Sequence, residues 1–283
     1  MCPDTSGLPA ISLGRGIFLC VLGCLIGAYS TLCGIGGGIF AVPLLHYAYG
    51  MSLKTAIANS LVLVAASTAA ATVSEAMRPD SALHMEVLAL LVIGSLAGTQ
   101  IGYRIQQRVD ARRLKIVFCV VMLAVGAKVL FTSPQRGGSL APDVDLSIAQ
   151  SAWIALVGCA AGVLAPLLGI GGGLVAVPGM FLGLPALGYA SARACSTAMS
   201  VVNSCQSVWL YRREKKIHAP TAAWFAGGAL AGGIAGDWLI HFPFVVALAE
   251  KLLSATICFV ALRFAWDVRR GERAAEKKAT EAG

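Results

Sequence analysis

Residues 34–38 read GIGGG and are followed by IFAVP, and residues 169–173 read GIGGG again and are followed by LVAVP. The two copies stand 135 positions apart, from 34 to 169, at matching places in two apolar halves. Glycine adopts positive φ at little cost and lets a backbone approach a neighbour or a ligand closely. Glycine-interrupted apolar segments at corresponding places in two halves are typical of the binding site of a membrane carrier built from repeats. The sequence therefore predicts a duplicated membrane protein with a site at its glycines.

The composition favours a chain that lies in a lipid bilayer. Of the 283 residues, 57% are hydrophobic and 13% are charged, and the mean hydropathy is +0.77. A soluble domain carries charges at about a quarter of its positions. Several apolar stretches approach the ~20 residues that cross a bilayer, namely 57–76, 87–101, 116–131 and 244–262. The fold class that we predict is an all-α polytopic membrane protein.

The duplication extends beyond the glycines. AIANS at 56–60 matches ARACS at 192–196, and GSLAG at 94–98 matches GALAG at 228–232. Similar motifs in the same order indicate a true internal repeat. A stretch rich in Pro, Gly and Asp separates the halves and has the composition of a loop. The predicted units are a first membrane repeat at 13–131, a linker at 132–147, a second membrane repeat at 148–267 and a basic tail at 268–283.

Two topologies compete, with either eight crossings or ten segments in which each glycine motif is the tip of a hairpin. Basic residues crowd 104–115, 211–218 and 269–278, and such loops are usually cytoplasmic. Only the ten-segment topology places all three on one side. A single helix over 149–187 would also be roughly 58 Å long, too long for one crossing. We therefore predict two inverted five-segment repeats with glycine-tipped helical hairpins, a periplasmic linker and cytoplasmic termini.

The hairpin tips are the predicted solute site. A helix is expected to begin around Gly36 and around Gly171. The first N–H groups of a helix lack partners within the helix and carry partial positive charge, so they can bind an anion. The alternative is that the glycines serve only close helix packing. The candidate tip residues are Gly36, Gly37, Gly38, Gly171, Gly172 and Gly173.

Arg193 is the strongest charged candidate, because it stands inside an apolar span where a charge is costly. Its guanidinium could make a bidentate contact with an oxyanion. The alternative is that it snorkels to the outer interface. Asp237, near the end of another span, could relay protons or lie at the interface.

Neutral polar residues give a weaker signal. Asn59 and Ser60 stand at the repeat positions of Cys195 and Ser196, and Asn203 follows on the same predicted helix as Arg193. Their side chains could hydrogen-bond an anion or bridge neighbouring helices, and the sequence leaves both alternatives open.

Other function classes lack signatures. The nine cysteines are scattered without a CxxC motif, which disfavours a disulfide framework or a metal site. No cofactor, nucleic-acid or ATP-binding motif occurs, and no catalytic motif. An enzyme that uses Cys33 or Cys195 as nucleophile finds no His nearby in the sequence. The N-terminal region 1–13 has no Lys or Arg, so a cleaved signal peptide is not predicted.

GIGGGIFAVPLL at 34–45, GIGGGLVAVPGMF at 169–181 and the segments AIANSL and ARACSTAM resemble the TauE/SafE family of sulfite exporters, also called the 4-toluene sulfonate uptake permease family. The resemblance covers about residues 13–266. It implies a bacterial inner-membrane carrier of sulfite, sulfoacetate or related anions, with proton coupling as one alternative. Family members commonly carry a small hydroxyl residue where this chain has Asn59 and Cys195.

Together these features predict a secondary transporter for a small sulfur-containing anion, working by alternating access and not an enzyme. The alternative is a membrane-embedded structural or assembly subunit without a substrate of its own. The direction of transport, the coupling ion and the oligomeric state are left open by the sequence.

Overall fold

The computed structural model describes residues 12–108, 146–184 and 187–242, together with residues 244, 245, 248, 249, 251, 252 and 255. Every regular element in these ranges is helical. The predicted fifth segment of the first half, most of the linker at 132–147 and the basic tail at 268–283 lie outside the described residues, as does nearly all of the fifth segment of the second half. Those predictions stay predictions.

The first half begins with a long helix that leads into the first glycine tip. A short helix returns from the tip and widens into one π-helical turn, and two long helices follow. Their bounds are α1 Leu13–Cys33, α2 Gly38–Pro43, η2 Leu44–Ala48, α3 Leu53–Ala76 and α4 Met85–Arg108. Ser52 caps α3 by accepting a hydrogen bond from the Thr55 amide, which is how a serine at this position stabilises a helix start.

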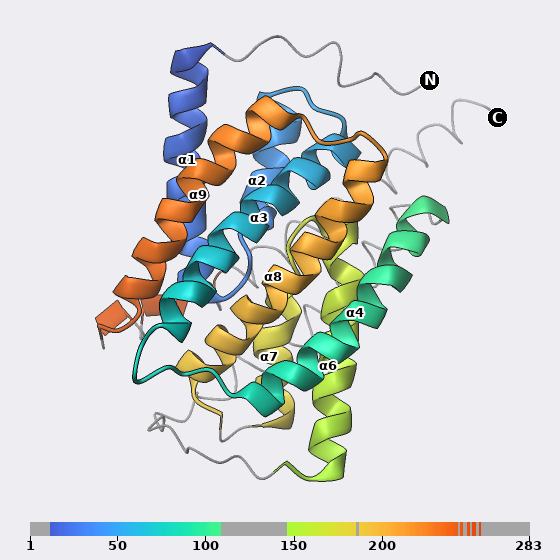
Figure 1. Ribbon diagram of the computed structural model, residues 1–283, viewed down its shortest axis with the longest axis vertical. Helices are drawn as coiled ribbons and strands as arrows, with labels where there is room; N and C mark the ends of the chain where they lie inside the picture. The colour runs from blue at the N-terminus through green and yellow to red at the C-terminus, as the bar shows by residue number, and fades with distance from the viewer. Residues whose placement is uncertain are drawn as a thin grey trace, which may run out of the picture.

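The second half repeats this order. Its helices are α6 Ile148–Leu168, α7 Gly173–Gly183, α8 Tyr189–Arg213 and α9 Ala219–Leu239. A capping box of Ser147 and Gln150 fixes the start of α6. In Figure 1, α1 and α3 run downward and α4 upward, whereas α6 and α8 run upward and α9 downward. Corresponding helices, α1 and α6, α3 and α8, and α4 and α9, thus run in opposite directions in this view.

Four helices are long and apolar enough to cross a membrane: α1, α3, residues Met85–Gln107 of α4, and α6. They have 21 to 24 residues, a length that matches the ~30 Å hydrocarbon core of a bilayer. The chain is therefore an all-helical, multi-pass membrane protein. The more polar helix α8 is largely buried among the others, which is where polar groups must lie at membrane depth.

The two glycine tips have the same backbone conformation. Gly34 and Gly169 end their helices with φ of 67° and 73°, and Gly37 and Gly172 have φ of 69° and 92°. Only glycine adopts this region readily. The helices after the tips begin at Gly38 and Gly173, two residues later than expected, because the left-handed glycines cannot belong to a right-handed helix.

The first helix of each half packs against the fourth helix of the other half. α1 lies along α9, and α4 lies along α6 (Figure 1). Glycines make this close approach possible: a Cβ on Gly228 would lie 1.8 Å from the Cys20 carbonyl oxygen, and one on Gly98 would lie 2.1 Å from that of Cys159. The repeated GxxxG-type motifs therefore serve helix packing, and they interlock the two halves.

Candidate functional site

The two glycine tips meet inside the protein. A Cβ on Gly38 would lie 1.7 Å from the Gly169 carbonyl oxygen, and one on Gly173 would lie 2.1 Å from that of Gly34. Gly36, Gly37, Gly171 and Gly172 are buried in the same region. The expectation that the tips converge is confirmed. The contact is backbone against backbone, so close packing is one role of these glycines.

Two serines join the tips crosswise. The Ser60 hydroxyl lies 3.1 Å from the Gly169 carbonyl oxygen, and the Ser196 hydroxyl lies 2.9 Å from that of Gly34. Each serine thus donates from one half to the glycine tip of the other half. Ser60 also lies 2.8 Å from the Ile57 carbonyl oxygen of its own helix. In the structure these hydroxyls bridge the halves, which is one of the two alternatives that the sequence left open.

The remaining neutral candidates differ in their surroundings. Asn203 donates to the Gly171 carbonyl oxygen at 3.3 Å and accepts from Thr99 at 3.4 Å, so it contacts the second tip. Asn59 donates to the Thr55 carbonyl oxygen within α3, and the buried Cys195 thiol lies 3.7 Å from the His84 carbonyl oxygen. The hydrogen bonds of Asn59 and Cys195 within the described residues do not reach the tips.

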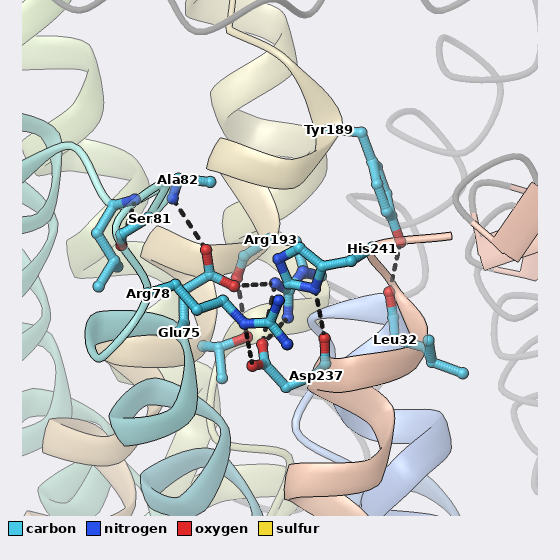
Figure 2. Close-up of polar contacts among 11 residues, drawn as sticks. Leu32, Glu75, Arg78, Ser81, Ala82, Tyr189, Arg193, Asp237 and His241 are labelled. Carbon is cyan, nitrogen blue, oxygen red and sulfur yellow. Dashed lines mark hydrogen bonds and ion pairs between the residues drawn. The ribbon is translucent and has the colours of Figure 1, made fainter. Parts of the chain in front are cut away.

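Arg193 is buried, with 1% of its side chain exposed, and it contacts two carboxylates of its own chain (Figure 2). Its Nη2 atom lies 2.6 Å from Glu75 Oε2, and both Nη atoms lie 3.2 Å from Asp237 Oδ1. The guanidinium therefore does not snorkel to an interface in this conformation. The Nη donors of the guanidinium already bind protein carboxylates, so a solute oxyanion would have to compete with those carboxylates for them.

Glu75, Arg78, Arg193 and Asp237 form what we call the charge cluster. Arg78 Nε lies 3.9 Å from Asp237 Oδ2, and the Ala82 amide donates to Glu75 Oε1 at 2.9 Å. Two arginines balance two carboxylates, so the cluster is electrically neutral. It joins the end of α3, the start of α8 and the end of α9 (Figure 2). A buried ion network is tolerated at membrane depth only because its members pair with one another.

Two members of the cluster, Arg78 and Glu75, were not foreseen from the sequence, and Glu75 is the one that contacts Arg193. It stands at the end of an apolar span, 118 positions before Arg193. Asp237 was noticed, but its burial beside an arginine was not foreseen. The available signal was charge pairing: three ionisable residues at the ends of three spans need partners, because an unpaired charge in a bilayer is costly.

A second polar group of side chains, which we call the tyrosine cluster, lies at the C-terminal ends of α4, α6 and α8. The Tyr211 hydroxyl donates to the Pro166 carbonyl oxygen at 2.9 Å and to Gln106, and the Gln106 amide donates to the same carbonyl at 3.1 Å. The Tyr103 and Tyr211 rings pack edge to face at 5.7 Å, and Tyr103 donates to Glu214.

The two clusters occupy equivalent positions in the repeat. Aligning the halves through Ser60 with Ser196 and Gly102 with Gly236 gives three corresponding pairs: Glu75 with Tyr211, Asp237 with Tyr103, and Arg193 with Ile57. The charge cluster is thus matched in the repeat by a group built on two aromatic rings, with Glu214 as its carboxylate.

A many-helix membrane protein with two buried glycine tips belongs by architecture with membrane carriers. The family model described as "Sulfite exporter TauE/SafE" matches residues 6–129 and 154–283. The chain belongs to the TauE/SafE family, and it is a probable membrane transporter.

Two kinds of relative support this placement. A "Probable membrane transporter protein" of Xylella fastidiosa (strain 9a5c) is 28% identical over 267 residues, which cover 86% of this chain and 92% of the relative. The "Probable membrane transporter protein MamO" of Magnetospirillum gryphiswaldense is 37% identical over 137 residues. That match covers 46% of this chain and 21% of MamO, so the chain spans about a fifth of the MamO length. No solved structure matches.

Proposed function

We propose that the protein is a secondary transporter of a small sulfur-containing anion such as sulfite or an organosulfonate. The meeting of two glycine tips inside a membrane protein is the observation that carries the proposal. Irregular backbone is tolerated at membrane depth where it is buried in protein or lines a cavity, and helix starts at such places favour anions. Membership of the TauE/SafE family supports the substrate class.

The two clusters suggest how access alternates. Opening of the charge cluster would expose the tips to one side, and opening of the tyrosine cluster would expose them to the other. Because α1 packs on α9 and α4 on α6, the moving bodies would combine helices from both halves. We propose that Arg193 changes partners during this cycle, leaving the carboxylates of Glu75 and Asp237 for the anion. Those carboxylates are also the candidate sites for proton coupling.

The basic residues support an orientation. The ends of α4 and α8 that carry Arg104, Arg212 and Arg213 point the same way in Figure 1. Following the positive-inside rule, we propose that this end faces the cytoplasm of a bacterial inner membrane. The charge cluster and the linker at 132–147 would then face the periplasm, with both termini cytoplasmic.

The test is transport by the purified full chain in proteoliposomes. Sulfite, sulfoacetate, thiosulfate and sulfate are supplied in turn, and flux is measured with and without a pH gradient. We expect saturable flux of at least one sulfur anion and a rise in melting temperature in its presence, since a ligand that binds only the folded state stabilises it. If none of the four anions moves or stabilises the protein, the proposal is overturned in favour of a structural or assembly subunit.

A further inference from the structure

A row of buried polar side chains runs along one side of α8. Its members recur every three or four residues, the spacing that keeps side chains on one helix face: Arg193, Ser196, Ser200, Ser204, Ser207 and Tyr211. The row connects the charge cluster at the start of α8 to the tyrosine cluster at its end, and it passes the second glycine tip on the way.

Three hydroxyls in this row lack a partner. Those of Ser200, Ser204 and Ser207 are fully buried and make no hydrogen bond within the part of the chain that the structure describes. Buried hydroxyls in a helix ordinarily donate to a carbonyl oxygen one turn back, as Thr68 does here to Val64 at 2.7 Å and Ser95 to Val92 at 3.0 Å. Buried polar groups without a partner are uncommon in native proteins and call for an explanation.

The Ser204 hydroxyl and the Ser200 side chain lie beside Gly171, just before the start of α7. A Cβ on Gly171 would lie 3.2 Å from the Ser204 hydroxyl oxygen and 3.5 Å from Ser200 Cβ. α7 begins two residues later and has 11 residues, so its first N–H groups carry the partial positive charge of a helix N-terminus. Unpaired hydroxyl donors and a helix start therefore lie side by side in the interior.

In the first half, the buried and unpaired hydroxyl of Ser30 lies 3.2 Å from where a Cβ on Gly37 would stand, but the positions that correspond to Ser200 and Ser204 carry no unpaired hydroxyl. The repeat places Val64 opposite Ser200 and Thr68 opposite Ser204. Val64 is apolar, and the Thr68 hydroxyl is satisfied within α3. The helix after the first tip, α2, has only six residues before it widens into the π-helical turn. The two tips, alike in backbone, thus differ at the positions of Ser200 and Ser204.

We propose that the anion binds at the second tip, between the N-terminus of α7 and the side chains of Ser200 and Ser204. This inference rests on the proposed function and narrows its site. The ligand class is a small oxyanion whose oxygens accept hydrogen bonds from neutral donors. Such neutral donors would hold a sulfite or sulfonate head in the conformation in which Arg193 is still paired with Glu75 and Asp237.

The test compares Ser200→Ala/Ser204→Ala with Thr68→Val, which alters the equivalent position of the first half. All proteins are full chains in proteoliposomes and detergent, and the anion is the one that wild type transports. We expect the double variant to melt at or above the wild-type temperature without anion, because it loses no hydrogen bond. Its anion-dependent stabilisation should disappear and its flux should fall at least tenfold. Thr68→Val should keep its anion-dependent stabilisation and its flux within twofold of the wild-type values.

The outcomes separate this inference from the proposed function. Wild-type flux in the double variant overturns the second-tip site while transport itself stands. A lower melting temperature of the anion-free double variant also overturns it, since the hydroxyls would then have structural partners. If Thr68→Val loses as much anion-dependent stabilisation and flux as the double variant, the two tips share the site. Absence of flux in wild type itself defeats the proposed function, and this inference with it.

Discussion

At the scale of single residues, Arg193 shows how burial changes the meaning of a charge. Its guanidinium is matched by Glu75 and Asp237, so its removal acts first on folding. Removing one partner of a buried ion pair typically costs about 3–5 kcal/mol, because the remaining charges stay buried without compensation.

We therefore expect Arg193→Ala to lower the free energy of unfolding by about 3–5 kcal/mol and to reduce expression. The matched control is Glu75→Gln/Arg193→Met/Asp237→Asn, which removes the cluster's buried charges together and should fold much better than the single variant. Denaturant unfolding of the purified proteins measures the free energy of unfolding of the single variant and of the triple variant. The assignment of Arg193 to an ion network fails if Arg193→Ala is as stable as wild type.

The crossed serines make a second prediction at this scale. Ser60→Ala and Ser196→Ala each leave a buried glycine carbonyl of the opposite tip without its donor, which costs roughly 1–3 kcal/mol. Similar losses in thermal unfolding are expected for the two variants, since their contacts are equivalent in the repeat. A loss in only one of them would show that the two bridges are not equivalent.

At the scale of helices, close packing depends on which face a glycine occupies. On α9, Gly228 faces the backbone of α1, and a Cβ there would lie 1.8 Å from the Cys20 carbonyl oxygen. Its neighbour Gly227 has no atom within 4 Å of an added Cβ. The two positions share a helix and a membrane depth but not a contact.

Gly228→Ala should therefore force α1 and α9 apart and sharply lower the melting temperature and the yield of folded protein. Gly227→Ala should be neutral or stabilise the protein by up to about 1 kcal/mol, the helix propensity difference between alanine and glycine. Thermal unfolding of the adjacent pair in detergent gives a direct comparison. Equal effects at the two positions would contradict the packing of α1 on α9.

At the scale of the whole molecule, the ends of the helices bear on the orientation. Asp80 is exposed just after α3, near the charge cluster, and Lys215 is exposed just after α8, at the opposite end. The proposed orientation places Asp80 in the periplasm and Lys215 in the cytoplasm.

On a background without native cysteines, Asp80→Cys should react with a membrane-impermeant thiol reagent in intact cells. Lys215→Cys should react only after the membrane is permeabilised. The two variants serve as controls for each other, because each reports on one end. The reverse pattern would invert the proposed topology and place the charge cluster on the cytoplasmic side.

The sequence by itself determined the membrane class, the duplication and the glycine tips, because these depend on local properties: apolar length, repeated motifs and the positive φ that glycine permits. Only the tertiary structure decided which groups meet. Glu75 reaches Arg193 across 118 positions, α1 packs on a helix of the other half, and the side chains of Ser200 and Ser204 come to lie beside Gly171. Such contacts arise when helices distant in the chain bury their faces together, and no local pattern specifies the partner.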